Sequence, residues 1–419
     1  MTPRVSVERL RREGEQFMEQ LSREYYSAHS GLKSTAELQP VYEAHRDILG
    51  PDALAVAREY FAGSPEGSED RRSARLLLDW QVESQSSREL APLDEREIAW
   101  DGDAVVTTAD GRRIPYQRVA IEVGNSTDRH ERAAIDTARA SLVQRELAPI
   151  RRERFQRERD ITESLGLAPG YNSTWELLSG VSLTALRDEC AAFLRDTQAI
   201  WDEVLPLAAK RVLGMRPDEL ARADALALFR AREFDDAFPA AEMESRVQRQ
   251  VSELGVDPLA NGRIRLDTGE REGKRSRAFC APVRVPEEVY LVLRPHGGQS
   301  DWSTFLHELG HALHFAYARP DYPFEYRWLG DNSVTESYAM LFDGLMQDAG
   351  WLRRYTDLSG DRLKSFMRSA GFEELHFLRR YCAKLVYETQ LYGGEVGWKQ
   401  LPDLYVQLLT SATTFRYVP

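Results

Sequence analysis

The chain has 419 residues, of which 67 are Asp or Glu and 55 are Lys or Arg, and it carries a formal net charge of -12. This negative charge opposes binding to phosphate backbones and to anionic lipid surfaces, so neither nucleic acid nor a membrane is an expected partner. A chain of this length is longer than those that usually fold around a single hydrophobic core, and we therefore expect two lobes.

The N-terminal stretch MTPRVSVERLRREGEQFMEQ has no apolar core of signal-peptide length. No later segment approaches the roughly 20 apolar residues that cross a bilayer. The three cysteines, Cys190, Cys280 and Cys382, are odd in number and widely spaced, which favours reduced thiols over a disulfide framework. Together these observations predict a cytoplasmic protein.

The first half of the chain is predicted to be helical. Apolar residues recur at helical spacing from Leu10 to Tyr25 and again in residues 131–165 and 183–213. Between these segments, AVVTTADGRRIPY places an Asp-Gly turn between two short β-prone runs, which predicts a minor hairpin. We therefore assign residues 1–245 to a helical N-terminal lobe with a hairpin near residues 104–116.

Residues 246–419 form the second expected lobe. They begin with short β-like pieces, of which residues 289–293 are the best strand candidate in the chain. Helical spacing then resumes in residues 305–317, 334–348 and 362–392. The fold class that follows is mainly α with a small β-sheet next to the helix at residues 305–317.

That helix contains the stretch TFLHELGHALHFAY, which places histidines and a glutamate in an otherwise apolar run. Residues four apart share a helix face, so His307 and His311 can direct imidazole nitrogens at one point. Glu308 is offset by one residue, which keeps it off a metal but within reach of a water molecule there. The H-E-x-x-H pattern is typical of a zinc site with a general base, and a buried helix with hydrogen-bonded histidines is the alternative.

A catalytic zinc ion needs a third protein ligand and an open fourth position. Three downstream acids compete for this role, namely Glu325, Asp331 and Glu336. Asp331 lies in LGDNS, which resembles a turn leading into a helix, while Glu336 lies inside SVTESYAMLFDGLM. Ser333 and Glu336 also fit a capping box at a helix start, which would bond Glu336 to the backbone instead. Spacing alone leaves both interpretations of Glu336 open.

The run from REGKRSRAFC through HELGHALH to the helix containing Glu336 resembles the thimet oligopeptidase and oligoendopeptidase F family of zinc peptidases. The resemblance implies one zinc ion per chain on His307, His311 and Glu336, with Glu308 as general base. Asp343 falls where the family keeps a second acid. The resemblance also implies a large helical zinc-peptidase fold, two lobes around a substrate channel, and short peptides as substrates.

Two features depart from the family pattern. Arg277 stands where the family usually has glycine before AFC, so a close backbone approach or a substrate contact is expected to differ. The family also continues past a stretch like LLTSATTFRY into a segment whose tyrosines face the zinc, whereas this chain ends at Pro419. Either the sequence is C-terminally truncated, or Tyr387 and Tyr392 replace those tyrosines. As helix-packing aromatics these two residues need no function.

Three further residues are candidates for supporting roles. Asp343 can hydrogen-bond a ligand histidine and fix its tautomer, or it can be an acid on a helix surface. His314 lies near the face of His307 and His311, but a fourth protein ligand would close the site, so we expect it to pack or to support a ligand. His296, in RPHGGQSDW, can reach substrate or remain a solvated loop residue.

The expected function is a zinc-dependent endopeptidase that hydrolyses short peptides, with Glu308 taking a proton from the attacking water. The strand at residues 289–293 is the expected edge on which an extended peptide pairs, which favours broad specificity. A zinc carboxypeptidase of similar helical build is one alternative. A zinc-containing peptide-binding protein, inactive because C-terminal transition-state donors are missing, is another.

Overall fold

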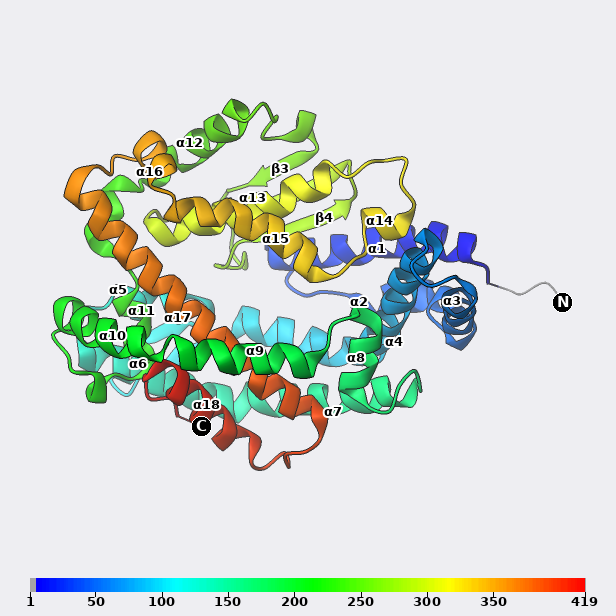
Figure 1. The fold of residues 1–419 in the computed structure, drawn as a ribbon, viewed down its shortest axis with the longest axis horizontal. Coiled ribbons are helices and arrows are strands. Elements are labelled where there is room, and N and C mark those ends of the chain that lie inside the picture. The colour runs from blue at the N-terminus through cyan, green and yellow to red at the C-terminus, as the bar shows by residue number, and fades with distance from the viewer. Residues whose placement is uncertain (1–4, 419) are drawn as a thin grey trace. The chain divides into compact units, whose positions relative to one another are not determined.

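The computed structural model describes residues 5–418, and these are mainly α-helical with two small sheets (Figure 1). The mainly α fold predicted from the sequence is confirmed. The chain folds into two compact units, each assembled from three stretches of sequence. Unit 1 takes the described residues of Met1–Asp103, Ile150–Leu165 and Phe238–Leu345, and unit 2 those of Ala104–Pro149, Gly166–Ala237 and Met346–Pro419. The lobes expected at residues 1–245 and 246–419, with a channel between them, stay predictions.

Unit 1 contains the helix predicted from Leu10 to Tyr25. This helix begins after Ser6, whose hydroxyl accepts a hydrogen bond from the Arg9 N–H, and it buries Leu10 and Phe17 on one face. The helices of the unit are α1 (Val7–His29), α2 (Leu38–Ala44), α3 (Pro51–Gly63), α4 (Glu69–Asp103), α7 (Ala148–Ser164), α12 (Ala240–Glu253), α13 (Gln299–Ala316), α14 (Phe324–Arg327) and α15 (Asn332–Asp343), with 3-10 turns η1 (Arg46–Ile48) and η6 (Ala260–Gly262). The turn η7 (Gly344–Gln347) leads out of the unit. None of the helices described in either unit is long and apolar enough to cross a bilayer.

A three-stranded sheet completes unit 1, formed by β3 (Ile264–Asp267), β4 (Phe279–Arg284) and β5 (Glu288–Val292). β5 lies in the middle, parallel to β3 in the register Ile264↔Val289 and antiparallel to β4 in the register Cys280↔Leu291. The strand predicted at residues 289–293 is confirmed. Its expected role as a peptide-pairing edge is wrong, because β3 and β4 occupy both of its sides. Among the described strands, β4 lies at the edge of this sheet.

Helix α13 carries the H-E-x-x-H motif and packs against β4 and β5 (Figure 1). It begins after Gly298, whose φ of 90° suits glycine and few other residues. Leu306, Leu309 and Leu313 are buried on the side that forms the core. The motif is therefore a core helix whose remaining face is free to carry polar chemistry, and the small sheet lies next to it as predicted.

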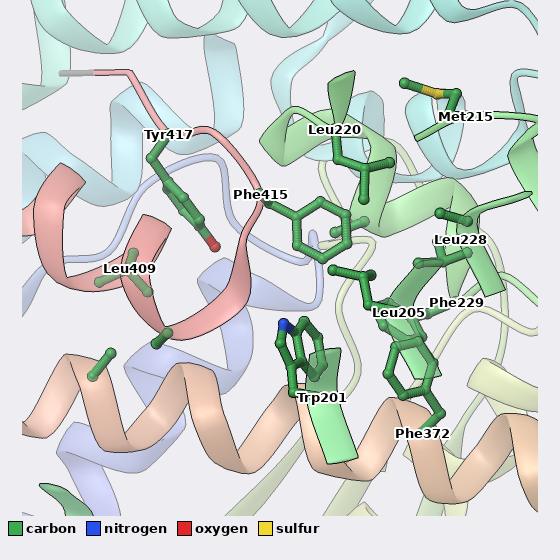
Figure 2. Close-up of a cluster of buried hydrophobic side chains, with 14 residues drawn as sticks. Trp201, Leu205, Met215, Leu220, Leu228, Phe229, Phe372, Leu409, Phe415 and Tyr417 are labelled. Carbon is green, nitrogen blue, oxygen red and sulfur yellow. The ribbon is translucent and has the colours of Figure 1, made fainter. Parts of the chain in front are cut away.

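Unit 2 has its own core, an aromatic cluster around Trp201 that includes Phe229, Phe372 and Phe415 (Figure 2). Its helices are α5 (Val119–Asn125), α6 (Arg129–Leu142), α8 (Tyr171–Ser179), α9 (Leu183–Asp196), α10 (Gln198–Leu213), α11 (Arg222–Leu228), α16 (Ala349–Tyr355), α17 (Gly360–Gly393) and α18 (Leu401–Thr413), with shorter turns η2 (Tyr116–Arg118), η3 (Val143–Leu147), η4 (Pro217–Glu219) and η5 (Arg232–Ala237). The predicted hairpin is confirmed as the antiparallel pair β1 (Val105–Thr107) and β2 (Arg113–Pro115).

Candidate metal centre

Two histidine side chains of α13 converge with a carboxylate of α15. The ring centroids of His307 and His311 are 4.9 Å apart, and the rings are nearly perpendicular. Glu336 approaches both rings, with Oε2 at 3.4 Å from His307 Nε2 and Oε1 at 3.8 Å from His311 Nε2. One ligand atom from each residue lies within 4.8 Å of the others, and no other set of described His, Cys, Asp and Glu residues converges in this way.

Gly310 makes this convergence possible. It stands between the two histidines, and a Cβ placed on it would lie 2.5 Å from the carbonyl oxygen of Tyr338 and 2.6 Å from the Cα of Ala339. Both are backbone atoms of α15, so neither can move aside as a flexible side chain can. The helices α13 and α15 therefore cross with their backbones in contact, which only glycine permits.

The donor set fits a catalytic zinc ion. Two imidazole nitrogens and one carboxylate oxygen are ligands that zinc prefers, and three protein ligands leave a fourth position open. Zinc–ligand bonds of about 2.1 Å in a tetrahedron place neighbouring ligand atoms roughly 3.4 Å apart. The distances from Glu336 to the two Nε2 atoms, 3.4 Å and 3.8 Å, are close to that spacing. The residues present could hold the ion with little movement.

The other two acids considered as third ligand have different partners. Glu325 is fully buried, and the Nη2 of Arg11 donates to its Oε1 at 2.6 Å. Asp331 is the N-cap of α15 and accepts a hydrogen bond from the Ser333 N–H at 2.8 Å. The capping box considered for Ser333 and Glu336 is therefore wrong, because Asp331 caps the helix. Glu336 lies further along α15, where it approaches the histidines.

Asp343 orients His307. Its Oδ2 lies 2.9 Å from His307 Nδ1, two helical turns beyond Glu336 on α15. An ionised carboxylate can only accept, so Nδ1 donates, and the neutral ring keeps the lone pair on Nε2 that faces Glu336. The hydrogen bond to Asp343 is also the main cause that raises the pKa of His307. The arrangement matches the tautomer-fixing role considered for Asp343.

Thr335 positions His311, a contact that the sequence did not reveal. Its Oγ1 lies 2.8 Å from His311 Nδ1. A hydroxyl can donate or accept, so this bond orients the ring without fixing its tautomer. Burial lowers the pKa of His311, which favours the neutral ring that a metal requires. The only sequence signal was adjacency to Glu336, because the contact exists only once α13 and α15 cross.

Glu308 lies beside the edge strand β4, where it accepts a hydrogen bond from the Cys280 N–H. Burial raises the pKa of Glu308, while the charge of His307, the Cys280 N–H and the charge of Arg277 act in the opposite direction. A carboxylate with a raised pKa is suited to take up and return a proton near neutral pH. The backbone of β4 therefore contributes to this site, which spacing within the motif could not show.

The remaining histidines of the region stand apart from the three donors. His314 stacks on Tyr338 of α15, with ring centroids 4.6 Å apart and planes at 9°. Its Nδ1 is buried and has no hydrogen-bond partner within residues 5–418. His296 is exposed in the loop before α13, and its backbone N–H donates to Asp301. A packing role fits His314, and a substrate contact for His296 stays a prediction.

The two tyrosines considered as substitute donors belong to α17 of unit 2. Tyr392 stacks on Tyr171 at 4.1 Å between ring centroids, and Tyr387 meets Tyr405 edge-on at 5.1 Å. Burial raises the pKa of Tyr387. Both side chains therefore take part in aromatic packing within their own unit, and a catalytic role for either stays a prediction.

No family model and no curated protein matches the sequence, but solved structures share the fold. PZ peptidase A, solved with an inhibitor, aligns with a TM-score of 0.67 at 13% identity over 98% of this chain and 75% of that chain. A Bacillus anthracis protein assigned as an oligoendopeptidase F aligns at 0.61 with 15% identity, over 94% and 71%. Trypanosoma cruzi metallocarboxypeptidase 1 aligns at 0.51 with 14% identity, over 97% and 78%. The chain therefore has the fold of these large helical peptidases, as the resemblance in its motifs implied.

Proposed function

We propose that this protein is a zinc-dependent peptidase that hydrolyses short peptides. The supporting observation is the convergence of His307, His311 and Glu336 on one point, with Glu308 next to them on α13. The fold shared with peptidases agrees with this chemistry but does not by itself assign it. In the proposal, the three converging residues hold one zinc ion per chain.

When bound, the ion would polarise the carbonyl of the scissile peptide bond and lower the pKa of water from about 15.7 to about 7. Glu308 takes the proton from the attacking water and then delivers it to the leaving amine. The Cys280 N–H holds the Glu308 carboxylate in place while the proton moves. Asp343 keeps the Nε2 lone pair of His307 directed at the site.

The substrate pairs with β4 in this proposal. β4 is an edge strand, and it carries the Cys280 N–H that contacts Glu308. A peptide bound along such an edge uses main-chain hydrogen bonds, which are the same for every sequence. Pairing of this kind brings an extended peptide to Glu308 and favours short, unfolded substrates of broad sequence.

We propose endopeptidase activity first and keep carboxypeptidase activity as the second candidate. The likeness to a metallocarboxypeptidase, over 97% of this chain, is the observation that favours the second. The products distinguish the two activities. An endopeptidase releases internal fragments of a peptide, whereas a carboxypeptidase releases single residues from the C-terminus and leaves a ladder that mass spectrometry resolves.

The test exchanges Glu308→Gln and uses quenched-fluorescent peptides with zinc-loaded protein. The variant should lose about 100- to 10,000-fold in kcat/KM, because the proton transfer loses its base, while elemental mass spectrometry still finds one zinc per chain. Glu287→Gln is the matched control, since Glu287 is exposed in the turn before β5. Unchanged cleavage by Glu308→Gln would remove Glu308 from the mechanism. Peptide binding without turnover by the unaltered protein would favour the binding-protein alternative.

A further inference from the structure

One basic residue next to the candidate metal centre has no hydrogen-bond or ion-pair partner among the described residues. The loop that leads into β4 carries several positive side chains, and most of them are neutralised within unit 1. The pairs are Arg271 and Lys274 with Asp267, and Arg275 with Asp101. Arg277 is exposed and forms no hydrogen bond or ion pair with any residue from 5 to 418. An unpaired guanidinium among paired neighbours is available for a ligand.

Arg277 lies close to the reacting groups. It precedes β4, and three residues later the Cys280 N–H contacts the Glu308 carboxylate. Three residues of extended chain span at most about 10 Å. Helix α13 packs against β4, so the start of this strand lies beside the helix that carries Glu308. A peptide that pairs with β4 and presents its scissile bond to Glu308 would therefore pass Arg277 within a few residues of that bond.

The charges at the site decide what Arg277 would bind. Glu308, Glu336 and Asp343 place three carboxylates in this region, on a chain with a net charge of -12. The zinc ion of the proposed function would offset two of these three charges, and Arg277 supplies a further positive charge that attracts a negatively charged substrate. Its planar fork of N–H donors matches a carboxylate and forms two parallel hydrogen bonds with it. The same charge would repel a basic side chain at that position.

Building on the proposed peptidase function, we propose that Arg277 binds a carboxylate of the peptide substrate within a few residues of the scissile bond. Arg277 is then a specificity residue, which selects peptides with a negative group at that position. The carboxylate is either the C-terminus of a short peptide or the side chain of an Asp or Glu. Both present the same chemistry to the guanidinium, and matched peptides separate them.

The experiment compares peptides that share one cleavable core. One pair differs in a free or amidated C-terminus, and a second series exchanges Asp for Asn at single positions on either side of the bond. The unaltered protein should favour one carboxylate-bearing peptide by about 10- to 100-fold in kcat/KM, mainly through KM. Arg277→Ala should remove this preference, so that charged and neutral peptides give the same kcat/KM as each other, and Arg277→Lys should retain part of it.

Arg275→Ala is the matched control, because it removes the same charge from the same loop where the charge is already paired. It should keep the preference of the unaltered protein. Sensitivity to amidation assigns the C-terminal carboxylate as the partner, and sensitivity to Asn assigns a side chain. Equal kcat/KM for charged and neutral peptides would overturn the proposal. An Arg277→Ala variant that loses kcat equally for every peptide and still prefers the carboxylate would also overturn it, since that result marks a role outside carboxylate binding.

A binding measurement separates this inference from the proposed function. The same peptides are titrated onto zinc-loaded Glu308→Gln protein by fluorescence anisotropy, with and without Arg277→Ala. A preference for the carboxylate that disappears in Arg277→Ala supports the inference even if the unaltered protein cleaves no peptide. Equal binding of acidic and neutral peptides would refute the inference while leaving peptidase activity intact.

Discussion

Polar side chains have different partners in the candidate metal centre of unit 1 and in the aromatic core of unit 2. In unit 2, Arg379 is almost fully buried, at 1% exposure, and forms no ion pair among the described residues. Its N–H groups are instead satisfied by neutral acceptors: the carbonyls of Ala412 and Leu194, the hydroxyl of Thr197 and the side-chain oxygen of Gln198. A buried polar group costs little once it is fully hydrogen-bonded. These hydrogen bonds of Arg379 therefore stabilise the core of unit 2.

At the crossing of α13 and α15, neighbouring side chains orient the polar groups but leave their ligand atoms facing one another. His307, His311 and Glu336 direct their ligand atoms at one another, and the Glu336 side chain is 45% exposed. Partners such as Asp343 and Thr335 bind the far side of each ring and leave the inner side free. Converging donors of this kind gain most of their stabilisation from a cation. The buried arginine of unit 2 is therefore satisfied within the fold, whereas the donors at the crossing of α13 and α15 converge on a candidate metal site.

Gly310→Ala is the substitution expected to disrupt the candidate metal centre of unit 1 most. The added Cβ would meet the backbone of Tyr338 and Ala339 at 2.5–2.6 Å, so α13 and α15 must move apart. Zinc sites tolerate ligand displacements of about 0.2 Å. We therefore expect zinc affinity to fall by about 100-fold or more, measured by competition with a chelator, although alanine is normally the better helix former.

Gly63→Ala is the control within unit 1. Gly63 ends α3, and a Cβ placed there meets no atom within 4 Å. Zinc affinity should be unchanged in this variant. If Gly310→Ala also binds zinc within about threefold of the unaltered protein, a shift too small for 1 kcal/mol, the backbone contact does not set the ligand geometry.

Low pH should lower the free energy of unfolding of unit 2, because the ring of His376 is buried in its neutral form. The ring lies among aromatics, 4.6 Å from Phe229 and 5.5 Å from Phe415 between centroids, and its Nε2 has no hydrogen-bond partner among residues 5–418. Burial lowers the pKa of His376 from 6.5 to about 4. Between these values the unfolded chain binds the proton and the folded chain does not. Stability from the neutral ring is therefore complete above about pH 6.5 and is lost as pH falls toward 4.

The loss should reach at most about 3.5 kcal/mol, at about 1.4 kcal/mol for each pKa unit. Urea unfolding at pH 7 and pH 4.5, followed by circular dichroism, measures it. His376→Phe keeps a ring in the cluster but cannot take up a proton, so its free energy of unfolding should fall less between the two pH values. An identical fall in both proteins would show that other groups cause the acid sensitivity.

Local periodicity explains why much of the candidate metal centre could be proposed from sequence. His307, Glu308 and His311 depend only on the geometry of one helix, which spacing specifies. The third ligand depends on which residue of α15 meets α13, and this follows from the contact at Gly310. Spacing therefore left Glu325, Asp331 and Glu336 open, and the resemblance to a family was needed to favour Glu336.

The same limit applies to the sheet. The apolar, β-branched run at residues 289–293 was enough to predict a strand. Its position between β3 and β4 depends on pairings between segments that are distant in sequence, which the run itself does not encode. The capping box failed for a related reason, because Asp331 and Ser333 are both good N-caps and only the path of the chain into α15 selects one.

The two hydrogen bonds to the ligand histidines should differ in strength. Asp343→Ala removes a charged acceptor that also fixes the tautomer of His307, so zinc affinity should fall by about 10- to 100-fold. Thr335→Val keeps the shape of the side chain and removes a neutral hydrogen bond, so the loss should be only about fivefold. Chelator competition measures both. A larger loss in Thr335→Val than in Asp343→Ala would contradict the tautomer argument for His307.

The smallest expected effect is a gain in stability, from the same substitution at a second helical glycine. Gly371 lies inside α17 of unit 2, is exposed, and has no atom within 4 Å of a Cβ built on it. Gly371→Ala therefore lowers the entropy of the unfolded chain and adds no overlap, which should raise the free energy of unfolding by about 0.5–1 kcal/mol. Thermal unfolding should shift upward by about 1–4 °C. The same exchange would then destroy a binding site at Gly310 and strengthen a helix at Gly371, because only the first glycine has another backbone against it. Destabilisation by Gly371→Ala would mean that the exposed face of α17 contacts something in solution.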